Sequence, residues 1–290
     1  MSPTALALVL TAALLHATWN IAAKGAGGDD RVGFIWLYIV VCSVLWAPVG
    51  LAWVLVTGER PTGWWLVGPL VSALLHIVYQ LALQRGYAEG DLNVVYPLAR
   101  GAGPMLTFLV AVSVLGQSLQ AVEVTGILAI VGGVLLISVA GRAGQRGKRH
   151  AGAGWGLGTG ATIAAYTLWD SHAVNGLHVP PLPYFVIGLL LQLPFLAVLV
   201  ARRSDPVPVR ELWVSARTPA LTVALCSPLA YVLVLRAMQL APVALVAAGR
   251  EASIVVGAVF GWLVLREPRP ARRLVGAAVV LAGIGLIAAG

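Results

Sequence analysis

The sequence contains little charge and almost no cysteine. Only 10% of its 290 residues are charged and 59% are hydrophobic, with a mean hydropathy of +0.90. An ordinary soluble domain has about 25% charged residues. The two cysteines, Cys42 and Cys226, show no spacing typical of a metal site or a disulfide framework. These shortages exclude a soluble globular domain and a disulfide-stabilised scaffold, and they indicate a chain whose solvent is lipid.

The sequence also lacks the motifs that catalysis would need. It has neither an HExxH nor a GxSxG segment, and its histidines are scattered along the chain at positions 16, 76, 150, 172 and 178. We therefore expect no enzymatic activity, no cofactor and no metal ion. A membrane scaffold or accessory subunit without transport activity is one class of function that stays open. Such a protein would carry large loops, but the longest polar segments here are 142–153 and 202–217.

Ten apolar runs are long enough to form helices that cross a membrane. A crossing of about 30 Å needs roughly 20 helical residues, and the connections between the runs are mostly short. The runs lie at 3–24, 33–56, 64–84, 92–115, 120–141, 154–174, 182–201, 219–239, 243–265 and 271–289. The predicted fold class is therefore an all-α integral membrane protein with ten transmembrane helices.

Basic residues are concentrated at every second connection. Of the 19 lysines and arginines, 15 lie at odd-numbered connections, whereas Arg60 and Arg236 lie at even-numbered ones. Membrane proteins set their orientation by such an asymmetry, which explains the net charge of +8 without nucleic-acid binding. We predict a multi-pass protein of the lipid bilayer whose odd connections face the cytoplasm and whose two termini lie outside.

An internal repeat organises the chain. When the sequence is shifted by 150 residues, polar and glycine positions of the two halves coincide. The coinciding pairs are His16 with Tyr166, Trp19 with Trp169, Asn20 with Asp170, Arg100 with Arg250, Gly126 with Gly276 and Gly133 with Gly283. Each half has five runs, so the second must be inserted upside down relative to the first, as in secondary transporters. We divide the chain into a first repeat (1–141), a basic connecting loop (142–153) and a second repeat (154–290).

The arrangement resembles the EamA-type branch of the drug/metabolite transporter superfamily over essentially the whole chain. The two five-run halves, the Trp19-Asn20 pair, and the Leu-Arg-Glu267-Pro turn before the helix of Gly276 carry the resemblance. It implies ten helices around a central cavity in a bacterial plasma (inner) membrane. It also implies small polar or amphipathic metabolites as substrates, often exported by a proton or exchange gradient. Gln117 departs from the family pattern, because an acidic residue is usual there.

Polar side chains within the first predicted helix point to a cavity. His16, Trp19, Asn20 and Lys24 lie along one stripe. An unpaired polar group in hydrocarbon costs several kcal/mol, so the stripe should face the bundle interior. His16 fits equally well as a hydrogen-bonding contact between helices, and Lys24 can reach the interface from the helix end. Because the sixth helix repeats the stripe, we predict that Trp19, Asn20 and Trp169 line a cavity.

Two acidic residues, Asp170 and Glu251, fall well within predicted spans. Burying a lone carboxylate costs at least about 3 kcal/mol on insertion scales, so each needs a partner or a role. Asp170 is a candidate carrier of a coupling proton, although its position near a helix end also allows hydration. Glu251 directly follows Arg250 and cannot face it, so we predict that Glu251 pairs with Arg100. Both carboxylates are candidates for coupling.

Arg100 and Arg250 lie at matching repeat positions, too deep within their helices to reach the interface easily. They fit either an internal salt bridge or a site for an anionic group of a substrate. Tyr96 shares a face with Arg100. Two arginines and two carboxylates within the membrane together favour an organic anion or a zwitterion such as an amino acid.

The third predicted helix carries His76, Tyr79 and Gln80 on one face, and the eighth carries Tyr231. Tyrosines suit the wall of an amphipathic cavity, and they equally suit an aromatic belt at the membrane interface. We assign these four residues to the cavity. The sequence thus predicts a secondary active transporter that exports a small organic metabolite by alternating access, with proton coupling or exchange; it leaves the oligomeric state open.

Overall fold

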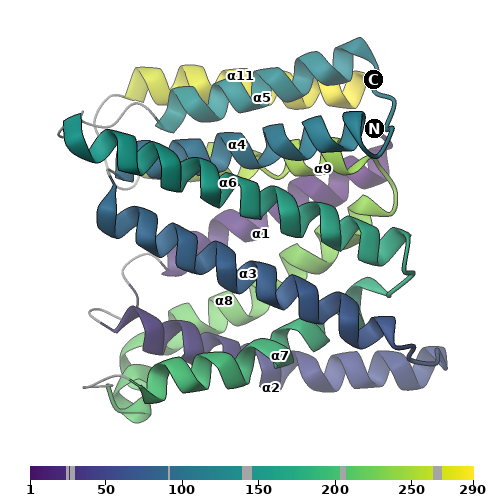
Figure 1. The fold of residues 1–290 in the computed structure, drawn as a ribbon, viewed down its shortest axis with the longest axis vertical. Helices are drawn as coiled ribbons and strands as arrows, with labels where there is room; N and C mark the ends of the chain where they lie inside the picture. The colour runs from purple at the N-terminus through teal and green to yellow at the C-terminus, as the bar shows by residue number, and fades with distance from the viewer. Residues whose placement is uncertain (24–25, 27–29, 91, 139–145, 203–206, 264–269) are drawn as a thin grey trace.

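The computed structural model describes all residues except 24–25, 27–29, 91, 139–145, 203–206 and 264–269. The described residues form helices and short connections, without a strand. The helices are α1 (Pro3–Ala23), α2 (Arg31–Thr57), α3 (Trp64–Glu89), α4 (Leu92–Ser113), α5 (Ala121–Ser138), α6 (Arg146–Asn175), α7 (Pro181–Ala201), α8 (Val209–Met238), α9 (Val243–Gly249), α10 (Ala252–Leu263) and α11 (Pro270–Ala289). They run side by side across the view of Figure 1, so that most connections lie at its two edges.

Seven helical segments of the described chain are long and apolar enough to cross a membrane. They are α1, α2, α3, α4, α7, α8 and the segment formed by α9 and α10. The apolar parts of α5 and α11 are shorter, and α6 begins with the polar sequence Arg-Gly-Lys-Arg-His. The all-helical membrane character predicted from the sequence is therefore confirmed.

Two predicted boundaries differ most from the structure. Helix α6 already begins at Arg146, so most of the segment 142–153 is helical rather than a connecting loop. Helix α8 begins at Val209, directly after Pro208, rather than at residue 219. Hydropathy marks only the part of a helix that lies in hydrocarbon. A polar or charged extension of the same helix is therefore read as a loop.

The predicted ninth span, 243–265, is interrupted rather than continuous. Between α9 and α10, the backbone N–H groups of Glu251, Ser253 and Ile254 donate to carbonyls three residues earlier, at 2.9–3.2 Å. Such short 3₁₀-type bonds tighten the helix and often mark functional positions. The interruption falls at Arg250 and Glu251, the pair that the sequence places deep within the membrane.

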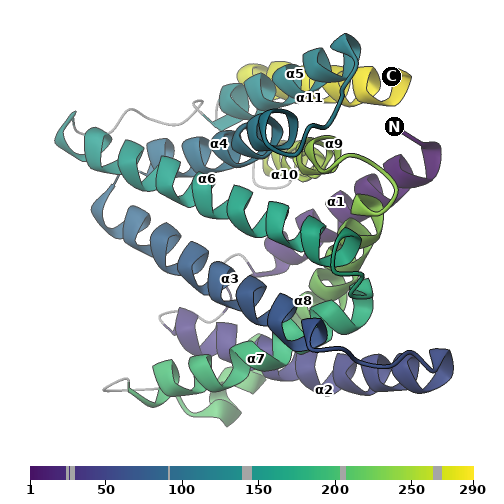
Figure 2. The ribbon, with the colours of Figure 1, turned by 45° about the vertical axis from the view of Figure 1, so that its right-hand side comes forward.

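Glycines let helices α5 and α11 approach closely. A Cβ atom added to Gly133 would lie 2.7 Å from the carbonyl oxygen of Gly276, and one added to Gly126 would lie 2.7 Å from that of Gly283. The earlier glycine of α5 thus meets the later glycine of α11, so the two helices are antiparallel. They form one end of the bundle, and α2 and α7 form the other (Figure 2).

Helices α4 and α6 also pack through glycines, but in parallel. A Cβ at Gly103 would lie 2.7 Å from Ile163, and one at Gly160 would lie 2.6 Å from the Cβ of Ala102. Helix α9, which is wholly buried, packs on α1 where Gly249 meets Val9. These close contacts hold α4, α6 and α9 in the middle of the bundle.

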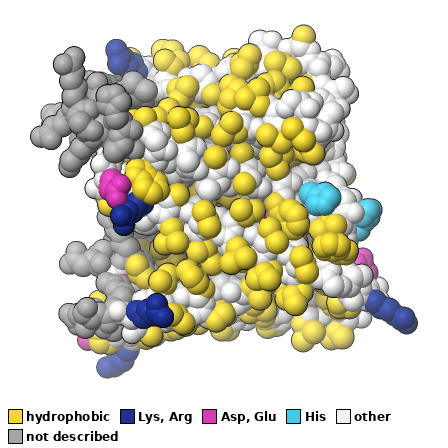
Figure 3. All heavy atoms as spheres, in the orientation of Figure 1, with side chains coloured by type: hydrophobic (Ala, Val, Ile, Leu, Met, Phe, Trp, Pro, Cys, Tyr) yellow, Lys and Arg dark blue, Asp and Glu magenta, His cyan; other side chains and the backbone are white. Residues whose placement is uncertain are grey.

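The outer surface is consistent with a lipid environment. Large apolar side chains are exposed along the helices, such as Leu55 at 73% and Val44 at 68%. In Figure 3 the apolar side chains spread over the face between the two edges, and the charged side chains in view gather at the edges. A membrane would cover this apolar face and leave the charges in the headgroup region.

Candidate functional site

A cavity of about 330 Å³ lies between the helices of the two halves. Its walls come from α1, α2, α3, α4, α6, α7 and α8, together with Arg250 at the interruption. On α1 and α3 the lining extends to Asn20 and Tyr87, near the ends of these helices, and on α2 and α4 it begins at Tyr38 and Tyr96, near their starts. The cavity therefore extends toward the side where α1 leads to α2 and α3 leads to α4.

Nearly all residues predicted to bind substrate line this cavity. They are Trp19, Asn20, His76, Tyr79, Gln80, Tyr96, Arg100, Tyr231 and Arg250. His16, for which the sequence left two explanations, also lines it, and its ring contacts that of Trp19 edge to face at 4.9 Å. The fold thus brings together side chains from both halves that are far apart in sequence. Their part in binding stays a prediction.

Trp169, the remaining predicted lining residue, is not part of the described lining. Its indole N–H donates to the carbonyl oxygen of Gly68 on α3, at 2.9 Å. The α6 side chains that line the cavity are Ile163 and Tyr166, and Tyr166 stacks on His76 with ring centroids 4.1 Å apart. The sequence repeat is thus reproduced only in part: His16 and Tyr166 both line the cavity, whereas Trp19 lines it and Trp169 does not.

All seven tyrosines of the chain line the cavity. They are Tyr38, Tyr79, Tyr87, Tyr96, Tyr166, Tyr184 and Tyr231. Of the ten tryptophans, by contrast, Trp19 alone is part of the described lining. The sequence allowed either a cavity wall or an interface belt for its tyrosines, and the structure decides for the cavity. An aromatic, hydroxyl-bearing wall suits a ligand with an apolar body and polar edges.

Sequence reasoning missed several lining residues. Tyr87 continues the stripe of Tyr79 and Gln80 by two helical turns, so helical spacing alone could have found it. Ser72 extends the same stripe by one turn, four residues before His76, so helical spacing could have found it as well. Tyr184 gave no such signal, because it lies near the start of α7, and tertiary packing alone places it in the lining.

Asp170 is buried beside the cavity at the end farther from Asn20 and Tyr87, and only 1% of it is exposed. Ser72 and Tyr184 each donate a hydrogen bond of 2.6 Å to its Oδ1, and the Tyr231 hydroxyl donates to Oδ2. Three hydroxyl donors from α3, α7 and α8 therefore compensate for the loss of water around the carboxyl group. The alternative that Asp170 is hydrated near the helix end does not hold in this structure.

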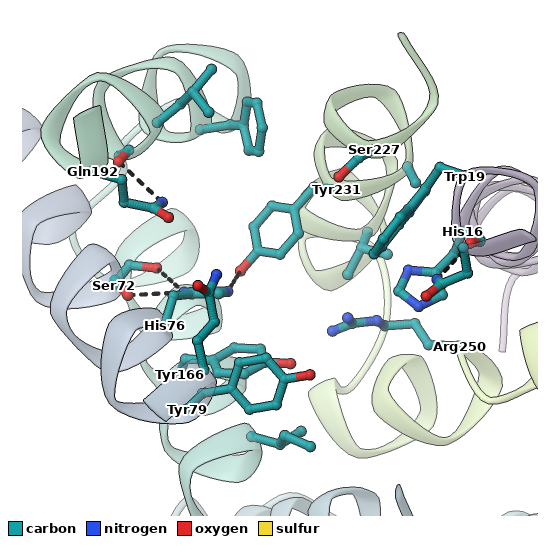
Figure 4. A pocket seen from close by; sticks show the side chains of 18 of the residues that line it. His16, Trp19, Ser72, His76, Tyr79, Tyr166, Gln192, Ser227, Tyr231 and Arg250 are labelled. Atoms are coloured by element: carbon teal, nitrogen blue, oxygen red, sulfur yellow. Dashed lines mark hydrogen bonds between the residues drawn. The ribbon is translucent and has the colours of Figure 1, made fainter. Parts of the chain in front are cut away.

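His76 extends this cluster into the cavity. Its Nδ1 lies 2.8 Å from the carbonyl oxygen of Ser72, and its Nε2 lies 3.3 Å from the Tyr231 hydroxyl. Figure 4 shows His76 and Tyr231 meeting across the cavity from α3 and α8. We define the Asp170 cluster as Asp170, Ser72, Tyr184, Tyr231 and His76. It ties α3, α6, α7 and α8 together.

The predicted pairing of Glu251 with Arg100 is present. Arg100 Nη1 lies 3.6 Å from Glu251 Oε1, joining α4 to the interruption between α9 and α10. The pair is incompletely satisfied, because Arg100 Nε and Glu251 Oε2 are buried without a hydrogen-bond partner among the described residues. Arg100 also lies over the ring of Tyr96, at 5.9 Å from the centroid. This pair therefore still has atoms that can form hydrogen bonds, whereas both carboxyl oxygens of Asp170 already accept them.

Arg250 points into the cavity from the interruption. In Figure 4 its guanidinium lies between His16 and Trp19 on one side and Tyr79 and Tyr166 on the other. Within the described part of the chain, no hydrogen bond or ion pair of at most 4.0 Å engages this guanidinium. A planar guanidinium with free donors in a partly enclosed site can hold a carboxylate or phosphate through two parallel hydrogen bonds.

Comparisons with known proteins agree with this architecture. Residues 150–289 match the EamA-like transporter family. One solved structure, described as "Crystal structure of protein", is similar with a TM-score of 0.75, covering 99% of this chain and 96% of its own at 17% identity. That likeness concerns the fold alone. No curated protein matches the sequence.

The class of protein that the fold and cavity define is thus a helical membrane protein with an internal cavity between its two halves. The second half of the chain, residues 150–289, carries the match to the EamA-like transporter family, whereas the similar solved structure supports the fold of the whole chain. The resemblance seen in the sequence is confirmed.

Proposed function

We propose that the protein is a secondary active transporter that exports a small organic metabolite, either an amino acid or an organic anion, across the plasma membrane of a bacterium. The observation that carries the proposal is the cavity between the halves, which combines a tyrosine-rich wall with Arg100 and Arg250. A binding site that contains a few polar groups in an apolar wall is typical of small-molecule recognition. The EamA-type family supports transport over catalysis.

We propose that the structure corresponds to a state open toward the cytoplasm. The lining reaches the side of the odd-numbered connections, which carry most basic residues. On the opposite side, the Asp170 cluster joins four helices. A substrate would enter from the cytoplasm, and the Asp170 cluster would have to separate before release outside.

Two inverted five-helix repeats would switch the access to the cavity from one side of the membrane to the other by rocking against each other. The idea is supported by the antiparallel crossing of α5 and α11, in which Gly133 meets Gly276 and Gly126 meets Gly283. The 150-residue repeat pairs Gly126 with Gly276 and Gly133 with Gly283, so each contact joins one glycine of α5 to the repeat counterpart of the other. Rocking of one repeat against the other around a fixed site is how inverted repeats provide alternating access.

Asp170 and Glu251 are the proposed coupling groups. A proton arriving at Asp170 would weaken the hold of its three hydroxyl donors, because a neutral carboxyl accepts weaker hydrogen bonds than a carboxylate. Glu251 would respond to substrate through Arg100, which it contacts at 3.6 Å. Proton uptake and substrate binding would thereby act on the two ends of one cavity.

Transport can be tested with proteoliposomes loaded with a metabolite extract from cells. Mass spectrometry would follow which compounds leave, with and without a pH gradient, for wild type, Glu251→Gln and Arg236→Gln. Arg236 is a matched control, because its guanidinium binds Gln239 at an exposed position outside the cavity lining. We expect selective loss of one compound or class with wild type and Arg236→Gln, and a weaker loss with Glu251→Gln.

The same experiment can refute the proposal. Liposomes that contain the same extract but no protein serve as the reference. If folded wild-type protein, inserted in both orientations, releases no compound faster than these liposomes do, the proposal that it transports a cellular metabolite is wrong. A scaffold or accessory role would then be the better explanation. If transport occurs but Glu251→Gln retains the wild-type rate and the wild-type response to pH, the function stands and the coupling role of Glu251 fails.

A further inference from the structure

The charges around the cavity are unequal. Its described lining contains Arg100 and Arg250 but neither aspartate nor glutamate. Glu251 lies behind the wall, 5% exposed, and is paired with Arg100. Asp170 is also outside the lining, and hydroxyl donors occupy both of its oxygens. The positive charge of Arg250 is thus the one that no described carboxylate contacts.

A zwitterion fits this arrangement poorly. The carboxylate of an amino acid would find Arg250, but its ammonium group would need a negatively charged partner to offset the loss of water. The neutral polar groups of the lining, such as the amides of Gln80 and Gln192, offer an ammonium group no opposite charge. A molecule that carries only the anionic group avoids the cost of desolvating an unpaired ammonium group.

The wall around Arg250 is aromatic. Trp19, Tyr79 and Tyr166 flank its guanidinium (Figure 4), and Tyr231 and Phe185 face the same space, with their rings 5.6 Å apart. Aromatic rings prefer offset-stacked or edge-to-face contacts with other rings. The volume of about 330 Å³ lies at the lower end of the usual range for ligand pockets, about 300–1,000 Å³. A compact ring system fits better than an extended chain.

We infer that the cavity selects a small aromatic monocarboxylate, with the carboxylate on Arg250 and the ring between the tyrosines, and that it discriminates against amino acids. This inference rests on the proposed transport function and narrows its substrate class. Arg100 is not the main anchor, because Glu251 already engages it. Arg250 is therefore the residue that determines selectivity for charge.

Three probes that share one ring system test the inference. Indole-3-propionate carries the carboxylate alone, indole-3-propionamide is its neutral counterpart, and tryptophan is the same acid with an added ammonium group. Isothermal titration on purified protein in lipid nanodiscs would give the Kd of each. We expect indole-3-propionate to bind at least about tenfold more tightly than either of the others, as one charge-assisted interaction implies.

Matched variants assign the effect to Arg250. We expect Arg250→Gln to lose the preference for the acid over the amide, and Arg250→Lys to keep part of it, because lysine keeps the charge without the bidentate fork. Arg236→Gln is the control and should bind all three probes as wild type does. A monodisperse elution profile and an unchanged helical signal in circular dichroism would show that each variant is folded.

Three outcomes would overturn the inference: tryptophan binding as tightly as indole-3-propionate, the amide binding as tightly as the acid, or a folded Arg250→Gln protein that keeps the wild-type preference. Binding is measured without transport, so the two proposals fail separately. Selective binding of the acid without any transport in liposomes would leave this inference standing and refute the proposed function. Transport of another metabolite with no binding of the acid would do the reverse.

Discussion

The two polar clusters in the interior of the bundle differ in how completely their hydrogen bonds are satisfied. At the end of the cavity farther from Asn20 and Tyr87, three hydroxyls donate to Asp170, whose carboxyl group is almost fully buried. At the interruption between α9 and α10, Arg100 and Glu251 form a longer contact and each retains an unpaired buried atom. A saturated cluster holds helices together, whereas an unsaturated one has capacity to bind.

The difference follows from where the groups come from. The three hydroxyl groups that donate to Asp170 belong to three separate helices. The cluster therefore forms only when α3, α6, α7 and α8 are packed as observed. Arg250 and Glu251 are adjacent in sequence and point in different directions, so a single interruption presents one charge to the cavity and the other to α4. The proposed closing of the cavity and the proposed recognition of its substrate are thereby assigned to different groups.

Removing the saturated centre should have the largest effect. Asp170→Ala leaves three buried hydroxyls without their acceptor, and we expect it to lower the free energy of unfolding by about 2–3 kcal/mol. Asp170→Asn is the matched variant, because it keeps one carbonyl acceptor and should lose about half as much. Denaturation of purified protein with SDS, followed by circular dichroism, measures both. Equal stability of Asp170→Ala and wild type would remove the distinction between the clusters.

The unsaturated pair should respond less. We expect Arg100→Gln to destabilise by about 2 kcal/mol, below the 3–5 kcal/mol typical of breaking a fully buried pair. The reason is that 21% of the Arg100 side chain is exposed. The double variant with Glu251→Gln should be more stable than the sum of the single effects predicts, because no lone charge remains buried. Additive losses in the same assay would show that the two side chains do not interact.

The glycine contact between α5 and α11 is remote from both clusters, so a variant there measures the effect of packing alone on stability. Gly133→Ala should cost about 1–2 kcal/mol, because the new methyl group would meet backbone atoms of α11. Its neighbour is a strict control, since a Cβ at Gly132 meets nothing within 4 Å, and Gly132→Ala should be neutral or slightly stabilising. Thermal unfolding of the two variants compares them. If both variants behave alike, the close crossing of α5 and α11 is wrong.

Much of the site could be predicted from residue type and position. The membrane environment, the cavity-facing arginines, Trp19 and three of the seven cavity tyrosines followed from the cost of placing polar groups in lipid. The pairing of Glu251 with Arg100 followed from the fact that adjacent helical residues cannot face each other. Trp169 was misplaced because the repeat relates sequence positions and does not determine which neighbour an indole N–H reaches. The role of Ser72 and Tyr184 as hydrogen-bond donors could not be predicted, because it depends on the carboxyl group of Asp170 that they meet in the folded structure.

The sequence by itself determined that this chain is helical, is apolar enough to lie in a membrane and resembles a transporter family in its second half, because hydropathy, charge asymmetry and the family's residue pattern are all properties of the linear chain. The tertiary structure alone decided which polar groups are satisfied and which are free. Three hydroxyls from distant helices converge on Asp170, while the side chain of Arg250 faces the cavity. Convergence depends on how helices pack, and packing depends on shapes that no single stretch of sequence contains.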